Sequence, residues 1–176
     1  MAARGFIELL RLSEMARQRK QTGESSQADR WSGVAFLIES RRFVAPLGEI
    51  SEVLTLPEIT TVPGTHKWLR GLSNVRGRLL PITELAMFCG IDNARSDSRR
   101  KVMVIDQEVV FGGLIVDEVL GIQHFSRQQY IAKQGDAPLG IRPFLQGYFQ
   151  RDGTDWHVFL PSMLARDPQY LNASQS

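Results

Sequence analysis

The feature that most constrains the fold is a series of short apolar runs between Trp31 and Leu160, each followed by turn-forming residues. Runs of about four to eight residues that are rich in β-branched and aromatic side chains are typical of strands. The predicted strands are 33–38, 42–45, 53–56, 71–75, 78–82, 101–106, 109–116, 118–124, 142–149 and 155–160. Many short strands at this spacing indicate a mainly β chain folded into small barrels or a sandwich.

Turn and helix signals fit between these strands. The Asp152-Gly153 pair predicts a tight hairpin, because glycine tolerates the positive φ that such turns require. Short helical segments are predicted at 46–52, 83–89 and 161–166. Thr83 and Ser162 are predicted to accept hydrogen bonds from the free amide groups at two of these helix starts.

The chain divides into an N-terminal extension, a domain and a short tail. Apolar residues on one side of 3–20 predict an amphipathic helix, and a polar linker completes the extension at 1–30. The domain is expected at 31–171, with a polar stretch near 92–100 that separates two β-rich halves. Residues 172–176 form the predicted tail.

The distribution of charge argues against nucleic acid as a partner. The net charge of +2 arises within residues 1–30, which carry six basic and four acidic side chains. The rest of the chain has 15 of each sign, whereas nucleic-acid-binding domains concentrate basic groups. A small barrel that binds single-stranded nucleic acid is kept as the alternative function, since barrels of this kind are common scaffolds for it.

The sequence predicts a cytoplasmic protein without direct membrane insertion. No apolar run approaches the roughly 20 residues of a membrane span, and charged residues interrupt the region where a secretory signal would be apolar. The single cysteine, Cys89, has no partner for an internal disulfide and fits a reducing compartment.

No set of residues points to catalysis, a metal or another cofactor. His66, His124 and His157 are far apart in sequence and lack the close ligand pairs of zinc sites. Cys89 lies in an apolar setting, where a thiol is usually a small packed group. We therefore predict a protein that is not an enzyme.

The most informative segment is 69–85, which reads as a strand, a tight turn, a second strand and a short helix. Asn74 and Gly77 are residues that permit turn conformations. Arg76 beside the turn presents a planar group that can hold a carboxylate by two parallel hydrogen bonds, and Glu52 is a candidate for that carboxylate.

This segment resembles the CheW family of chemotaxis coupling proteins. The family's motif is matched by Asn74-Val75-Arg76-Gly77 and by Pro81-Ile82-Thr83-Glu84-Leu85, with Glu84 where aspartate is commoner and with Arg78 making the turn unusually basic. Further similar segments follow in order at 43–54, 110–119, 144–147 and 158–164. Details near Trp31 resemble the couplers of pathways that control type IV pili and twitching motility.

The resemblance implies a CheW-like domain of two intertwined, five-stranded Src-homology-type β-barrels with short helices. It implies an adaptor that binds the cytoplasmic tip of a methyl-accepting receptor and the regulatory domain of a CheA-type histidine kinase. Arg76 would either contact a partner or pair with Glu52. The residues expected at the partner-binding surface are Ile50, Glu52, Val53, Gly71, Asn74, Arg76, Gly77, Gly113, Val116 and Asp117.

Overall fold

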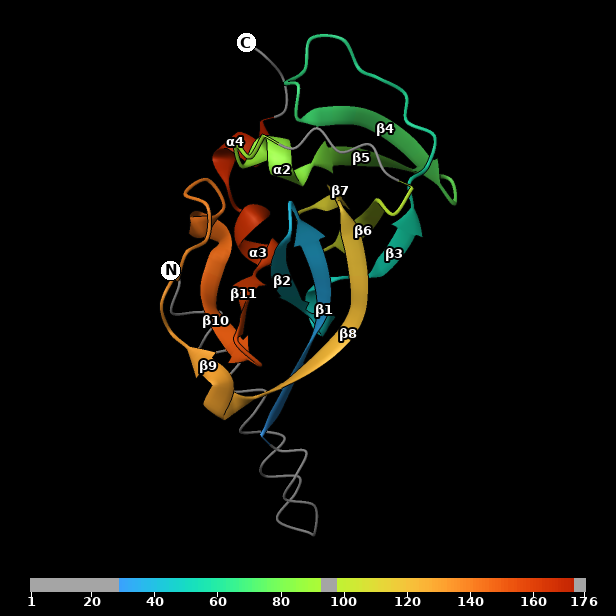
Figure 1. Ribbon diagram of the computed structural model, residues 1–176. Coiled ribbons are helices and arrows are strands. Elements are labelled where there is room, and N and C mark those ends of the chain that lie inside the picture. The colour runs from blue at the N-terminus through green and yellow to red at the C-terminus, as the bar shows by residue number, and fades with distance from the viewer. Residues whose placement is uncertain (1–28, 93–97, 173–176) are drawn as a thin grey trace.

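The computed structural model describes residues 29–92 and 98–172, which form a mainly β domain of two sheets (Figure 1). The predicted N-terminal helix at 3–20, nearly all of the linker and most of the predicted tail lie outside the described residues. The expectation of a mainly β chain with short helices is confirmed.

The first sheet has six strands in the order β8-β1-β2-β11-β10-β9. Its strands are β1 (Arg30–Ile38), β2 (Arg41–Pro46), β8 (Glu118–Ser126), β9 (Tyr130–Ile131), β10 (Leu145–Arg151) and β11 (Thr154–Phe159). Neighbours are antiparallel except for β11 and β2, which are parallel. The sixth strand was not predicted, because β9 has two residues and gives no periodic signal in the sequence.

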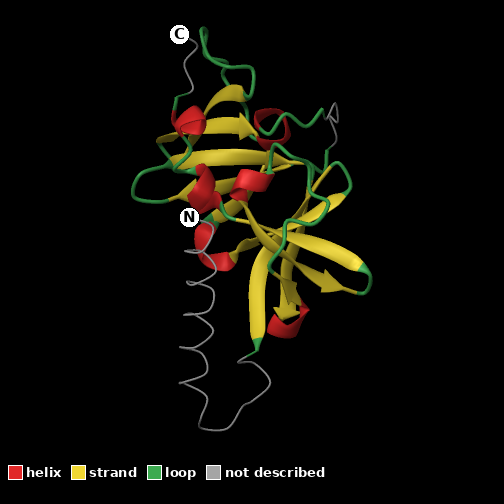
Figure 2. Cartoon of the chain, turned by 90° about the vertical axis from the view of Figure 1, so that its left-hand side faces the viewer, coloured by secondary structure: helices red, strands yellow, loops and turns green. Residues whose placement is uncertain are grey.

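The second sheet has five strands in the order β3-β6-β7-β5-β4. Its strands are β3 (Glu52–Thr55), β4 (Leu69–Val75), β5 (Arg78–Glu84), β6 (Lys101–Asp106) and β7 (Phe111–Val116). Here β5 and β7 are parallel, while the other neighbours are antiparallel. Figure 2 shows the two groups of strands stacked along the length of the molecule.

The chain passes between the sheets in an intertwined order. It builds β1 and β2 in the six-stranded sheet, then all of the five-stranded sheet, and returns through β8 to complete the first sheet. The polar stretch near 92–100 therefore does not separate the two sheets, because strands on both sides of it belong to the five-stranded sheet. Hydrophobicity along the chain marks strands but does not show which strands pair.

Short helices lie between strands and after the last strand. They are the 3-10 turns η1 (Leu47–Glu49), η2 (Arg127–Gln129) and η3 (Arg142–Phe144), and the helices α2 (Leu85–Phe88), α3 (Pro161–Leu164) and α4 (Pro168–Leu171). The predicted helical segments at 46–52, 83–89 and 161–166 correspond to η1, α2 and α3.

The predicted caps of α2 and α3 are wrong. Thr83 is buried within β5, and α2 begins only after Glu84. Ser162 lies inside α3, where its backbone N–H donates to Glu49 Oε1 at 2.8 Å. Glu49, from η1 at a distant point in the sequence, thus supplies the oxygen acceptor that a local serine was expected to provide.

Three apolar clusters hold the sheets together. Alternate residues of the central strands point to opposite faces, so Phe36, Phe43, Met103 and Leu114 fill a core shared by both sheets. Residues between them fill the separate core of each sheet, as Val44 does in the six-stranded sheet. Burial on both faces explains why these strands read as continuous apolar runs.

Candidate functional site

The β4–β5 hairpin has a two-residue turn formed by Arg76 and Gly77. Both residues have positive φ, 50° and 81°, which is the geometry of a type I′ turn. Asn74 Oδ1 accepts a hydrogen bond from the Gly77 backbone N–H at 2.9 Å. The motif thus encodes the turn, with Arg76 in a conformation that non-glycine residues rarely adopt.

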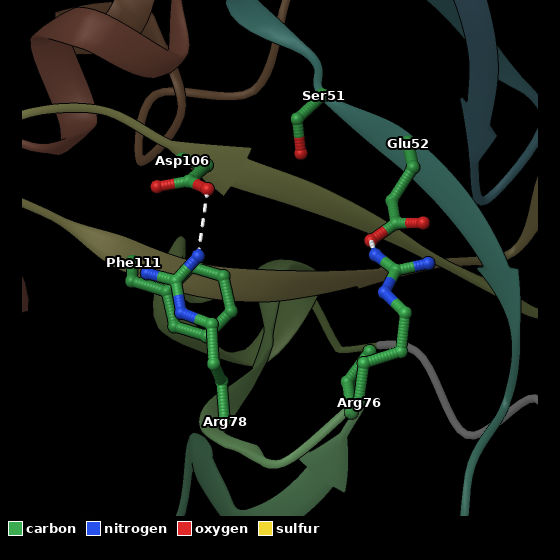
Figure 3. A pocket seen from close by; sticks show the side chains of 7 residues that line it. Ser51, Glu52, Arg76, Arg78, Asp106 and Phe111 are labelled. Atoms are coloured by element: carbon green, nitrogen blue, oxygen red, sulfur yellow. Dashed lines mark hydrogen bonds and ion pairs between the residues drawn. The ribbon is translucent and has the colours of Figure 1, made fainter.

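Arg76 forms an ion pair with Glu52, which is one of the two roles expected for it from the sequence (Figure 3). Glu52 belongs to β3, one edge of the five-stranded sheet, and the hairpin includes β4, the other edge. The pair therefore joins two edges that no backbone ladder connects. The Arg76 side chain is 73% exposed and that of Glu52 is 26% exposed.

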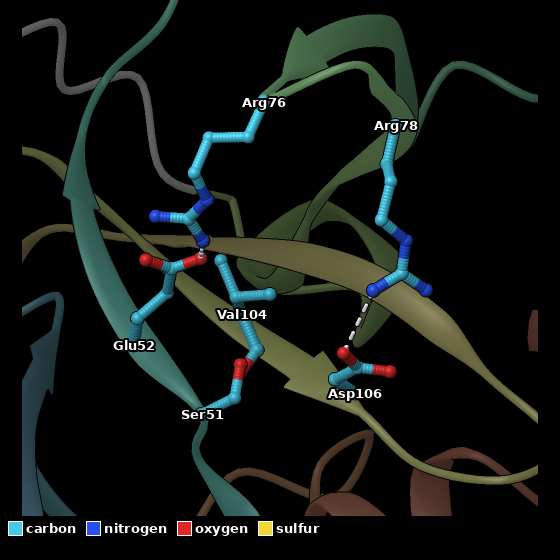
Figure 4. A network of polar contacts seen from close by, with 6 residues as sticks. All are labelled: Ser51, Glu52, Arg76, Arg78, Val104 and Asp106. Carbon is cyan, nitrogen blue, oxygen red and sulfur yellow. Dashed lines mark hydrogen bonds and ion pairs between the residues drawn. The ribbon is translucent and has the colours of Figure 1, made fainter.

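A second ion pair, between Arg78 and Asp106, lies beside the Arg76–Glu52 pair (Figure 4). Arg78 Nη1 donates to Asp106 Oδ2 at 2.9 Å, and its guanidinium group lies 3.7 Å from the centre of the Phe111 ring. Ser51 Oγ donates to the Val104 carbonyl oxygen at 3.2 Å, which ties the start of β3 to β6. The stacking contact and the ion pair fix the plane of the Arg78 guanidinium group.

An open cavity of about 340 Å³ lies between these groups. It is lined by Ser51, Glu52, Val75, Arg76, Arg78, Asp106 and Phe111. A cavity with two guanidinium groups suits recognition of planar anionic groups such as carboxylates. Its polar lining and exposure to solvent are typical of a protein-contact surface, since small-molecule sites are mostly apolar.

The structure brings part of the predicted set together at this hairpin. The turn residues Arg76 and Gly77 contact Glu52 and Asn74, respectively. The neighbouring Val53 and Ile50 continue the surface along β3 and before it. Val53 is exposed, and Ile50 is half-buried against the shared core.

Gly71 has a structural role in β4. A Cβ atom at this residue would lie 2.1 Å from the Thr60 carbonyl oxygen, and φ is +144°. Two backbone hydrogen bonds between Thr60 and Leu72 hold the 56–68 connection against β4. Gly71 therefore permits a close approach by the protein's own chain.

The three predicted residues of the second half lie away from the hairpin surface and are buried. Val116 is 1% exposed in the shared core, and a Cβ atom at Gly113 would lie 2.6 Å from Val102 Cγ1. Asp117 Oδ2 accepts from the Glu39 backbone N–H at 2.7 Å and so supports the turn after β1. Their place in the packing of this chain accounts for these residue types, and no contact with another protein is needed to explain them.

The cavity includes residues that sequence reasoning did not select. Ser51 precedes β3, whereas Asp106 and Phe111 are paired across the β6–β7 hairpin, and the sheet order brings both segments to one end of the five-stranded sheet. The basic character of Arg78 was the available signal, because two arginines at one turn repel each other and a nearby carboxylate supplies compensating charge. Which carboxylate supplies it depends on strand pairing.

The motif residue Glu84 lies elsewhere, in a buried ion pair with Arg100 at the end of β5. Burial raises the pKa of the Glu84 carboxyl group, while the Arg100 guanidinium acts in the opposite direction. This pair fastens the segment before β6 to β5, a structural use of the acidic position in the motif.

The groups considered for catalysis are dispersed or buried. Burial raises the pKa of the Cys89 thiol to about 12, which disfavours the reactive thiolate. His66 stacks on Trp68, whereas His124 contacts Ser32 within the six-stranded sheet. Within residues 29–92 and 98–172, no three His, Cys, Asp or Glu side chains gather in a way that could hold a metal ion. In the same ranges, no helix has the length and apolar character needed to cross a bilayer.

The two intertwined sheets have the fold of CheW-like domains. A crystal structure of scaffolding protein TtCheW from Thermoanaerobacter tengcongensis matches with a TM-score of 0.66 at 19% identity, covering 73% of this chain and 88% of that one. The sequence model of the CheW-like domain matches residues 32–169. The chain belongs to the CheW-like domain family.

Curated relatives agree with this assignment. Protein PilI of Pseudomonas aeruginosa is 42% identical over 144 residues, which is 82% of this chain and 80% of PilI. Chemotaxis protein CheW of Thermotoga maritima is 28% identical over 54% of this chain and 63% of its own. Protein FrzA of Myxococcus xanthus is 28% identical over 50% of this chain and 55% of its own.

Proposed function

We propose that the protein is a non-enzymatic adaptor that couples a methyl-accepting receptor to a CheA-type histidine kinase. The extensive similarity to PilI supports a place in the pathway that controls type IV pili and twitching motility. The observation that carries the proposal is the Asn74–Gly77 hairpin, which presents the family motif at the surface with Arg76 largely exposed. The adaptor works in the cytoplasm, next to the receptor array.

The proposed surface combines charge with exposed apolar groups. Arg76 uses one of its N–H groups toward Glu52 and keeps others for a partner, while Val53 adds exposed apolar area on β3. Asn74 and Gly77 fix the turn that places the arginine. Ile50, Glu52, Val53, Asn74, Arg76 and Gly77 are the proposed contact residues.

The packing supports a coupling role. Each sheet contributes to the shared core, so a partner held by one sheet is positioned with respect to a partner held by the other. Coupling between two binding partners is a free energy carried by such a common body. The adaptor would hold the kinase where receptor conformation biases its activity.

Binding measurements with both purified partners test this function. The full chain is expected to bind the receptor tip and the kinase regulatory domain with affinities typical of transient signalling contacts. Arg76→Glu should weaken binding to at least one partner by about 10-fold or more, because it replaces a charge-assisted contact with repulsion. Arg166→Glu, an exposed position between α3 and α4, is the control with the same change of charge.

Failure to bind the receptor tip, or failure to bind the kinase regulatory domain, would contradict the proposal. Tight, salt-sensitive binding of a single-stranded oligonucleotide by a chain that binds neither protein would support the alternative function instead. Unchanged binding by a folded Arg76→Glu variant would show that the motif arginine is not used.

A further inference from the structure

We propose that the cavity beside the β4–β5 hairpin receives an acidic side chain of the receptor tip, and that Arg78 is the residue that selects it. The inference rests on the proposed adaptor function and adds a ligand chemistry and a specificity-determining residue to it. Arg78 is absent from the family motif and lies outside the surface expected from the sequence.

Arg78 is held ready for an anion. Its guanidinium group stacks on Phe111 at 3.7 Å and is anchored to Asp106 at 2.9 Å, so both its plane and one edge are fixed. A guanidinium group has five N–H donors, and the contact with Asp106 uses one of them. The side chain is 56% exposed, which leaves donors accessible from the cavity and from solvent.

The cavity presents its positive groups outward. The four charges of Glu52, Arg76, Arg78 and Asp106 cancel, but each arginine is more exposed than the carboxylate with which it pairs. For Arg78 and Asp106 the side-chain values are 56% and 43%. An approaching partner therefore meets guanidinium groups first, and two of them line one cavity (Figure 3).

The lining favours a side chain delivered by a protein over a free small molecule. Val75 and Phe111 are the apolar residues among those that line the cavity, and Phe111 is already covered by Arg78. Small ligands need more apolar enclosure than this to bind well. A carboxylate carried by a docked protein needs only local complementarity, and aspartate or glutamate matches the planar fork of arginine.

The receptor tip is taken as the partner that reaches this cavity, and the proposed contact residues Glu52 and Arg76 line the same cavity. A partner seated on the hairpin brings its side chains within reach of Arg78, two residues from Arg76. A partner that offers a basic or apolar group here would cover the remaining N–H donors of Arg78 without supplying an acceptor, and this penalty supplies the selectivity.

Calorimetric titration of the full chain with the purified receptor tip tests the inference. Arg78→Glu should weaken binding by about 30-fold or more, and Arg78→Lys by a smaller factor of about 3- to 10-fold, because lysine keeps the charge without the planar stack. Arg42→Glu is the matched control, since Arg42 also lies over an aromatic ring, Trp156, but in the six-stranded sheet. Thermal unfolding of each variant verifies that it is folded.

Charge exchange identifies the carboxylate. Individual Asp and Glu residues of the receptor tip are replaced by Lys, and one of these variants should bind the wild-type chain weakly and regain affinity with Arg78→Glu. Wild-type binding together with unchanged binding by folded Arg78→Glu would overturn the inference and leave the adaptor function intact. A wild-type chain that does not bind the receptor tip would overturn both.

Discussion

Arg76 adopts a backbone conformation that costs about 1 kcal/mol for a residue with a Cβ atom, where glycine would carry no such penalty. Its exposed ion pair with Glu52 returns at most a comparable amount. The stability of the hairpin therefore gives little reason for arginine at this turn. Recognition of another protein does give one, because strained residues cluster at functional sites.

Arg76→Gly separates these two roles. We expect the free energy of unfolding to change by less than about 1 kcal/mol, because relief of the positive φ offsets the lost ion pair. The affinity for the partner should fall for Arg76→Gly, as it should for Arg76→Glu. Urea unfolding and titration measure the two effects, and a strongly destabilised Arg76→Gly variant would show that the arginine is mainly structural.

His157 provides a second prediction at the scale of the residue. It is 2% exposed on β11, and burial lowers the pKa of its imidazole below the ordinary value of 6.5 despite the nearby Asp136 and Asp155. Arg41 acts in the same direction as burial. A lowered pKa means that the unfolded chain binds the proton more readily than the folded one.

The contribution of neutral His157 to the free energy of unfolding should therefore be fully present above pH 6.5. It should be lost as pH falls through the pKa of folded His157. The decline from this group is at most about 1.4 kcal/mol per pH unit. His157→Gln removes the titration and should flatten the unfolding free energy between pH 7 and 5 relative to the wild type. Equal slopes for the two proteins would show that His157 does not titrate differently on folding.

At the scale of the element, the two glycines of the motif region differ in what they allow. Gly71 lets the 56–68 connection lie against β4, since an added Cβ would meet the Thr60 carbonyl oxygen at 2.1 Å. Gly77, with φ of +81°, completes the turn and has open space around it. Gly71 is therefore required by packing, and Gly77 is required by the backbone conformation of the turn.

Alanine at these positions should separate the two effects. Gly71→Ala is expected to cost about 2 kcal/mol or more, because the clash is with backbone and φ is positive as well. Gly77→Ala should cost about 1 kcal/mol from conformation alone. Denaturant midpoints measure both, and a smaller loss for Gly71→Ala than for Gly77→Ala would contradict this account.

The strands were predictable where one face is buried or the apolar run is continuous. The prediction for 109–116 began early, because the Gln107–Val110 turn closes with reciprocal backbone hydrogen bonds before β7 starts at Phe111. The prediction for 142–149 included η3, where Pro143 stands at the start of a 3-10 turn. The missed α4 had a signal in Asp167-Pro168, a capping residue followed by proline.

At the scale of the whole molecule, the shared core makes the two sheets one cooperative unit. Leu114 of β7 is fully buried there together with side chains of β1 and β2. The six-stranded sheet also has a side-chain closure of its own, because Arg151 of β10 donates to the His124 carbonyl oxygen and to Gln123 in β8. Neither sheet keeps its buried face if the other unfolds.

Unfolding should therefore follow a single transition. Tryptophan fluorescence, with Trp31 and Trp156 in the six-stranded sheet and Trp68 in the shared core, should coincide with far-ultraviolet circular dichroism. Leu114→Ala should lower the unfolding free energy by about 2–5 kcal/mol while the curves remain coincident. Separate transitions would show that the sheets unfold independently.

The local part of the candidate site was predictable, and the assembled part was not. The hairpin follows from Asn74 and Gly77, and the Arg76–Glu52 pair follows from charge and motif position. Asp106 and Phe111 come from other strands, and the sheet order that brings them to Arg78 is not written in any local pattern. Val116 belongs to an apolar run, and only tertiary packing shows that it faces the shared core.

The pair that closes the five-stranded sheet also makes Glu52 a tethered competitor for Arg76. A carboxylate on a partner shares the Arg76 guanidinium group with a carboxylate that is always present at high effective concentration. In the proposed adaptor this competition lowers the affinity for the partner, which suits a contact that forms and releases during signalling. Glu52→Gln should accordingly bind the partner more tightly than the wild type, and weaker binding in titration would show that favourable contacts of Glu52 with the partner outweigh its competition for Arg76.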